Sequence, residues 1–121
     1  MNIEELRNHC LAINHAEECT PFGDDVLVYK IMGKMFAFFP LNPKDGEHFV
    51  VLKCDPERSA ELRDTYAGVT KGYYSGNTLS WNSVYIRKDV PDSLIIELIT
   101  HSVEEVVKKL PKTKRESLIH S

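Results

Sequence analysis

The sequence predicts an α+β protein whose antiparallel sheet is covered by helices on one face. Short β-branched and aromatic runs follow one another across hairpin-like turns, and helical periodicity occurs before, between and after them. A length of 121 residues with 42% hydrophobic residues suits one domain with a buried core. The expected order is α-β-β-β-α-β-α, with the domain over residues 1–112 and a short polar tail over 113–121.

The first helix is predicted over residues 2–15. Asn2 can cap this helix, and Glu5 stands three residues later, which is the spacing of a capping box. Apolar residues recur at helical intervals and give the helix one apolar face: Ile3, Leu6, Cys10 and Ile13. Residues 20–25 are rich in turn formers and end this pattern.

Three antiparallel strands are predicted next, arranged as a meander. The first covers Val26–Met32 and the second covers Met35–Pro40, with Gly33-Lys34 between them as a type II′ turn. Residues 41–47 form a longer turn, and the third strand covers Phe49–Lys53.

The second half of the chain contains two helices and one strand in our prediction. Asp55-Pro56-Glu57 opens a helix that runs to about Thr65, and residues 67–80 are predicted to be an irregular loop. A strand follows over Trp81–Lys88, with alternate side chains on opposite faces. Pro91-Asp92 starts a last helix with an apolar stripe wide enough for a core or a dimer contact: Leu94, Ile95, Leu98, Ile99, Val103, Val106, Val107 and Leu110.

Charge is distributed unevenly although the formal net charge is only −3. Residues 1–25 contain six acidic residues against Arg7, whereas residues 67–88 contain Lys71, Arg87 and Lys88 and no acidic residue. The strand segments are therefore basic and the helical segments acidic, and such a field would attract a polyanion to the sheet. The alternative is that lysines on strand edges prevent edge-to-edge pairing.

The motifs of common enzyme classes are missing from the sequence. It contains no glycine-rich phosphate loop, HExxH or GxSxG, and His15 and Cys19 lack a second ligand pair downstream. We therefore expect no enzyme, no cofactor and no metal. Residues 72–82 are rich in aromatic residues and glycine, so they could stack on bases or close over a small ligand in a pocket with Tyr73, Trp81 and Asn82.

Five segments in register resemble the MmcQ/YjbR family. Residues 30–37 resemble its K-x-x-G-K-x-F-A hairpin, and residues 52–57 resemble its L-K-x-x-P-E step from strand to helix. Residues 72–73 and 81–84 are similar to its G-Y-H…W-N-T-V segment, while residues 90–92 and 110–112 match the start and end of its last helix. The resemblance implies a CyaY-like, frataxin-like fold, a double-wing arrangement and probable DNA binding.

Our leading hypothesis is a non-enzymatic cytoplasmic protein that binds duplex DNA through a basic sheet and hairpin face. The residues expected to contact nucleic acid are Lys30, Lys34, Lys53, Lys71, Tyr74, Asn77, Arg87 and Lys88. An alternative is a protein-interaction module with an acidic helical face, formed by Glu4, Glu5, Glu17 and Glu18. The odd number of cysteines and the short apolar runs favour a reducing compartment and no membrane contact, and the chain could be a monomer or a homodimer.

Overall fold

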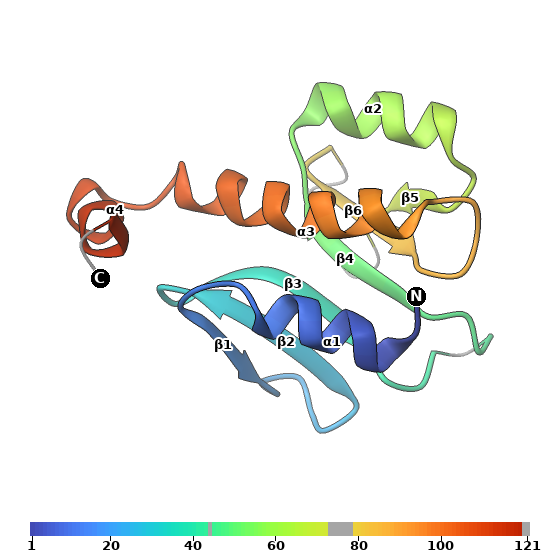
Figure 1. Cartoon of the computed structure of the whole chain (residues 1–121), viewed down its shortest axis with the longest axis horizontal. Helices are drawn as coiled ribbons and strands as arrows, with labels where there is room; N and C mark the ends of the chain where they lie inside the picture. The colour runs from blue at the N-terminus through green and yellow to red at the C-terminus, as the bar shows by residue number, and fades with distance from the viewer. Residues whose placement is uncertain (44, 73–78, 120–121) are drawn as a thin grey trace.

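A computed structural model describes residues 1–43, 45–72 and 79–119 of the chain. These residues form four helices and six strands (Figure 1). In chain order they are α1 (Ile3–Leu11), β1 (Ala16–Cys19), β2 (Val26–Ile31), β3 (Lys34–Pro40), β4 (Phe49–Lys53), α2 (Pro56–Thr65), β5 (Val69–Lys71), β6 (Trp81–Tyr85), α3 (Asp92–Val107) and α4 (Lys112–Ile119).

The strands form one antiparallel sheet in the order β1-β2-β3-β4-β6-β5. Helices α1, α2 and α3 contribute to a single core on one face of this sheet, in which Leu6, Leu62 and Ile95 represent the three helices. The predicted apolar stripe of α3 packs here, with Ile95, Leu98, Ile99, Val106 and Leu110 buried. The predicted α+β class and the β2-β3-β4 meander are therefore confirmed, whereas the predicted order α-β-β-β-α-β-α is wrong, because β1, β5 and α4 are added to it.

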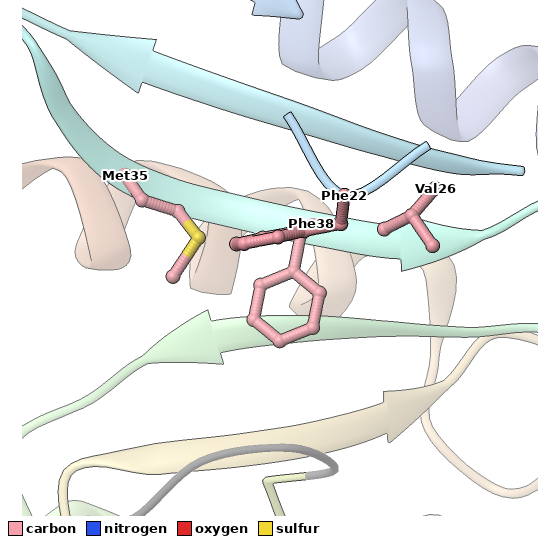
Figure 2. A pocket seen from close by; sticks show the side chains of 4 residues that line it. All are labelled: Phe22, Val26, Met35 and Phe38. Atoms are coloured by element: carbon pink, nitrogen blue, oxygen red, sulfur yellow. The ribbon is translucent and has the colours of Figure 1, made fainter. Parts of the chain in front are cut away.

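The second face of the sheet carries a smaller apolar cluster made only of strand residues within the described chain. Val28, Phe38, Phe49 and Val51 are buried at its centre. A shallow pocket of about 380 Å³ lies beside them, lined by Phe22, Val26, Met35 and Phe38 (Figure 2). Phe22, in the turn before β2, is 66% exposed. We call this surface the open face.

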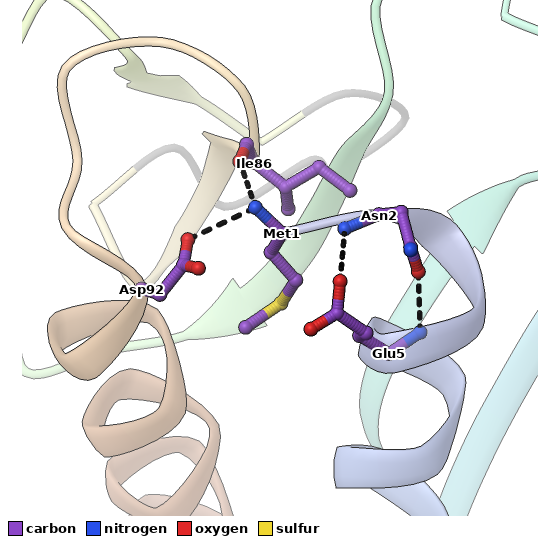
Figure 3. A network of polar contacts seen from close by, with 5 residues as sticks. All are labelled: Met1, Asn2, Glu5, Ile86 and Asp92. Atoms are coloured by element: carbon purple, nitrogen blue, oxygen red, sulfur yellow. Dashed lines mark hydrogen bonds and ion pairs between the residues drawn. The ribbon is translucent and has the colours of Figure 1, made fainter.

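Helix α1 begins with the predicted capping box. The Asn2 side chain accepts a hydrogen bond from the Glu5 amide at 2.8 Å, and the Glu5 carboxylate accepts one from the Asn2 amide at 3.2 Å (Figure 3). The amino group of Met1 lies 3.0 Å from the Asp92 carboxylate, which links the start of α1 to the start of α3. Both contacts fix the entry of the chain into the helical layer.

The predicted first helix is too long, because α1 ends at Leu11 and a strand follows at Ala16–Cys19. His15 adopts a positive φ of 68°, which turns the chain away from the helical path. The sequence did not indicate β1 because two of its four residues are glutamates, which are depleted in strands. An edge position accepts these charges.

The β2–β3 turn also differs from the prediction. Its two turn residues are Met32 and Gly33, with φ of 50° and 80°, and Ile31 pairs with Lys34. Positive φ at both positions is the pattern of a type I′ turn, not the predicted type II′ turn with Gly33 in first place. Lys34 therefore belongs to β3 and stands beside the turn.

Four further predictions need correction in the second half of the chain. Residues 67–80 are not irregular throughout, since β5 at Val69–Lys71 pairs with β6. Strand β6 ends at Tyr85, three residues earlier than predicted, because the chain turns where the Asp89 carboxylate accepts hydrogen bonds from the Ala67 and Gly68 amides at 2.8 Å. The last helix ends at Val107, and the predicted polar tail contains α4.

Candidate anion-binding cleft

The predicted lysines of the sheet do not form one basic face. The open face is apolar at its centre, and Lys30 stands directly across from Glu17 of β1. Strand register instead places the predicted cations at the two ends of the sheet. Lys30, Lys34, Lys53 and Lys71 lie toward the end that carries the β2–β3 turn, which we call the hairpin end, while Arg87 and Lys88 follow β6 at the opposite end.

Strands β3 and β4 separate near the hairpin end. Phe36 has no partner across β2, because Tyr29 pairs with Ala37 and Lys30 pairs with Met35, so β3 bulges at this residue. The pairing of β3 with β4 stops at Ala37 and Leu52. The β3–β4 gap therefore opens one residue further along, between Phe36 and Lys53.

The hydroxyl of Ser102, on α3, fills the inner side of this gap. It accepts a hydrogen bond from the Lys53 amide at 2.9 Å and donates one to the Phe36 carbonyl at 2.5 Å. These are the two backbone groups that direct strand pairing would have joined. One side chain from the helical layer thus satisfies both groups and keeps the strands apart.

A cleft of about 340 Å³ lies at this opening. Its residues come from β3, β4, β6, the end of α3 and the turn that follows: Lys34, Met35, Lys53, Trp81, Val106 and Lys109. The volume is at the lower end of the range for small-molecule sites. The lining combines three lysines with one aromatic ring and two apolar side chains, so the cleft suits an anion that also has an apolar or planar part. We call it the lysine cleft.

The charge balance of the lysine cleft favours an anion. Burial lowers the pKa of Lys53 below its usual range, and the positive charge of Lys109 lowers it further, while Glu105 acts in the opposite direction. Glu105 itself forms an ion pair with Lys108 at 2.6 Å. A bound anion would relieve the repulsion between Lys53 and Lys109.

Lys109 is the one lysine of the cleft that was not predicted from the sequence as a site residue. It follows α3, 56 positions after Lys53, and no spacing rule connects the two. The available signal was the Lys108-Lys109 pair near the end of an apolar helix, where cations are favoured by the helix dipole. Because the helix dipole alone explains lysines at this position, the Lys108-Lys109 pair does not by itself indicate a binding site.

Trp81 and Asn82 were predicted to share a ligand pocket with Tyr73, but they lie on opposite faces of β6. Trp81 packs with the open-face cluster and lines the lysine cleft. Asn82 is buried under α2, where it accepts a hydrogen bond from Arg63 Nε at 2.7 Å and donates one to Ser59 at 2.9 Å. Its role is structural, whereas Trp81 faces a cavity.

The backbone that carries Trp81 is held by three contacts. Its carbonyl accepts hydrogen bonds from the Gly72 amide at 2.9 Å and from Arg63 Nη2 at 3.1 Å, and the residue pairs with Lys53 across β4. A Cβ atom at residue 72 would lie 2.9 Å from the Trp81 carbonyl oxygen, so only glycine permits this close approach. The predicted residues Tyr73, Tyr74 and Asn77 lie outside the described residues.

The opposite end of the sheet has a more balanced set of charges. Lys88 forms an ion pair with Glu47 at 3.2 Å, and its Nζ lies 4.5 Å from the centre of the Tyr85 ring. A pocket of about 310 Å³ includes these residues with Arg87 and His48. The Nδ1 atom of His48 is buried and has no hydrogen-bond partner within the described structure. The Glu47 carboxylate therefore already pairs with one of the two cations at this end.

The predicted acidic face of the first helix is divided by the structure. Glu5 is part of the capping box, and Glu17 lies on the open face opposite Lys30. Glu18 accepts two hydrogen bonds from Arg7, at 2.8 and 2.9 Å, and one from the Tyr29 hydroxyl at 2.7 Å. The Arg7 contacts lower the pKa of Glu18, so this carboxylate is an internal ion-pair partner. Glu4 alone remains as an exposed acid of α1 outside these contacts.

Neither a metal cluster nor a membrane-spanning helix occurs within residues 1–43, 45–72 and 79–119. No group of three or more histidine, cysteine, aspartate or glutamate side chains in these ranges could hold a metal ion. No helix there has both the length and the apolar character needed to cross a membrane.

The fold and the cleft define a small α+β protein with a single antiparallel sheet and a basic opening at one end of it. A family model described as YjbR matches residues 11–104. The chain is 33% identical over 109 residues to YbdF of Escherichia coli O157:H7, covering 90% of this chain and 87% of that protein. It is 29% identical over 119 residues to YjbR of Escherichia coli K12, covering 98% of each. The chain therefore belongs to the YjbR family.

Solved structures agree with this assignment. The Deinococcus radiodurans protein DR2400, described by its domain DUF419, is 33% identical with a TM-score of 0.86, over 97% of this chain and 87% of that chain. A Pseudomonas syringae protein is 20% identical with a TM-score of 0.72, over 84% of this chain and 96% of that chain, and this second likeness concerns the fold alone. YbdF and YjbR are both described as uncharacterised proteins.

Proposed function

We propose that this protein is a non-enzymatic DNA-binding protein whose hairpin end contacts phosphates. The observation that carries the proposal is the convergence of Lys34, Lys53 and Lys109 around one cleft. Lysine is a common phosphate ligand, and phosphate contacts provide most of the affinity in sequence-independent binding. The footprint is smaller than the basic face that the sequence suggested, because the centre of the sheet is apolar.

The charge pattern supports this orientation. Of the acidic residues of α1 and β1, Glu5 lies in the capping box and Glu18 pairs with Arg7, whereas Glu17 stands opposite Lys30 and Glu4 is exposed. The three lysines of the cleft would attract a polyanion, and Glu17 beside Lys30 reduces the attraction on the β1 side of the hairpin end. Four expectations from the sequence stay predictions. They are the CyaY-like fold, the double-wing arrangement, the cytoplasmic location and the alternative role as a protein-interaction module.

The proposal is tested by fluorescence anisotropy of a labelled mixed-sequence duplex, titrated with protein at several salt concentrations. We expect affinity to fall linearly in log salt, with a slope that reflects about three phosphate contacts. Each of the variants Lys34→Ala, Lys53→Ala and Lys109→Ala should reduce that slope by about one unit.

The matched control is Lys88→Ala, which removes a lysine from the opposite end of the sheet. It should leave the slope unchanged. No binding at about 50 mM salt, where screening is weak, would reject the proposal. If Lys88→Ala reduced the salt slope as much as the three cleft variants do, the DNA contacts would not be confined to the hairpin end.

A further inference from the structure

The lysine cleft contains more than a phosphate site needs. Phosphate contacts require cations, and Lys34, Lys53 and Lys109 supply them. The same cleft also presents an indole ring, Trp81, with Met35 and Val106 as apolar lining. A site for the outside of a duplex has no use for this apolar part, because the bases of a duplex are stacked on each other and show only their edges in the grooves.

We propose that the lysine cleft binds single-stranded DNA, with one unpaired base stacked on Trp81 and the adjoining phosphates held by the three lysines. This inference rests on the proposed function and specifies the form of DNA. An aromatic side chain beside cations is the usual arrangement for single strands, because every base has a π-face. Since stacking does not read base edges, the binding has little sequence preference.

The geometry places the two kinds of contact side by side. Lys53 and Trp81 are direct partners across β4 and β6, so their side chains leave the same face of the sheet at neighbouring positions. A nucleotide carries its phosphate and its base on one sugar and therefore needs a cation and an aromatic surface next to each other. Met35 offers a flexible, polarisable side chain in the same cleft, and thioethers make favourable contacts with aromatic rings.

The site is preorganised by contacts that do not depend on a ligand. Ser102 holds β3 and β4 apart, and Arg63 and Gly72 fix the Trp81 backbone. Trp81 is half-buried, so part of its ring is already supported by the open-face cluster. The cleft has a volume of about 340 Å³, which is enough to admit a single planar ring.

The single tryptophan of the chain makes a direct test possible. Intrinsic fluorescence of the full-length protein is recorded during titration with a short oligothymidylate and, separately, with a duplex of the same length at the same salt concentration. We expect the single strand to quench Trp81 emission and to bind more tightly than the duplex. Anisotropy of labelled versions of the same oligonucleotides gives the two affinities independently of quenching.

Substitution of the aromatic ring separates stacking from charge. Trp81→Leu should weaken single-strand binding about 5- to 150-fold, the range measured for loss of one base–aromatic stack. Trp81→Phe should retain much of the single-strand affinity, because a phenyl ring can still stack on a base. Tyr85→Leu is the matched control, because Tyr85 is a half-buried aromatic residue on the same face of β6 at the other end of the sheet.

The outcomes distinguish this inference from the proposed function. Equal affinity for single strand and duplex, or unquenched Trp81 with a bound single strand, would overturn the stacking inference and leave phosphate binding in place. No binding of either form at low salt would reject both. The comparison of the two DNA forms uses the unaltered protein, so it remains decisive even if Trp81→Leu fails to fold.

Discussion

The hydroxyl of Ser102 accepts a hydrogen bond from the Lys53 amide, and this contact joins the middle of the last long helix to the end of a central strand. The same hydroxyl donates to the Phe36 carbonyl on the neighbouring strand. The sheet therefore opens at a place where the Lys53 amide and the Phe36 carbonyl still have a hydrogen-bond partner. This arrangement creates the lysine cleft without exposing unpaired strand edges inside the protein.

Ser102→Ala should destabilise the protein. The variant leaves the Lys53 amide and the Phe36 carbonyl without their partner in a buried place, and such a loss costs about 1–3 kcal/mol. Urea denaturation followed by circular dichroism measures the change. Thr100→Ala, on an exposed part of the same helix, is the control and should change stability by less than about 0.5 kcal/mol. Equal losses in both variants would contradict the bridging role.

DNA binding should weaken at alkaline pH because of Lys53. Burial and Lys109 lower the pKa of Lys53, so this side chain loses its proton at a lower pH than an ordinary lysine. The charge that attracts phosphate is present below that pKa and is lost as pH rises through it. Anisotropy titrations between about pH 7 and pH 10 would measure the decline, since an ordinary lysine titrates near pH 10.4.

Lys53→Arg provides the matched variant for this pH dependence. Arginine keeps its charge throughout the range, so the decline in affinity should move to higher pH. Identical pH profiles for the two proteins would show that Lys53 does not contribute its charge to the bound state.

Asn82→Ala should destabilise the protein by about 2–3 kcal/mol. The amide of Asn82 pairs with Arg63 and Ser59, and removing it leaves a charged guanidinium and a buried hydroxyl with fewer partners. Trp81 emission should also shift, because Arg63 holds the Trp81 carbonyl. Asn42→Ala removes an exposed amide and serves as the control. Thermal unfolding and fluorescence spectra measure both effects, and an unchanged melting temperature would contradict this account.

Stability should decline with rising pH on the alkaline side because of Cys10. Burial raises the pKa of the Cys10 thiol to about 12, whereas an unfolded cysteine titrates near about 8.5. Above the unfolded value the denatured chain releases a proton that the native protein retains, so the free energy of unfolding falls. The contribution of one such thiol is about 1 kcal/mol between roughly pH 8 and pH 9.5.

The pH dependence of the free energy of unfolding separates the effect of thiol ionisation from the effect of lost packing. Cys10→Ala loses packing at every pH, but its free energy of unfolding should decline less steeply than that of the unaltered protein over this range. Burial raises the pKa of Cys54 as well, so a residual decline is expected. Parallel slopes for the two proteins would assign the alkaline effect to other groups.

Local signals predicted the elements that have strong local causes. The Asn2–Glu5 capping box, the apolar stripe of α3 and the β-branched and aromatic runs of β2, β3 and β4 are properties of neighbouring residues, and the structure confirms them. Strands β1 and β5 were not predicted because they are short and contain charged or polar residues. They become strands only because β2 and β6 provide partners for their backbone groups.

The amino-acid sequence by itself determined the fold class, the helix start at Asn2 and the supply of lysines in the strand segments, because periodicity, capping and composition act over a few residues. Only the tertiary structure decided which lysines meet. Strand register places Lys34 and Lys53 at one end of the sheet and Arg87 at the other, while the length of α3 brings Lys109 to the first group. Such convergence depends on packing between distant segments, which no local pattern encodes.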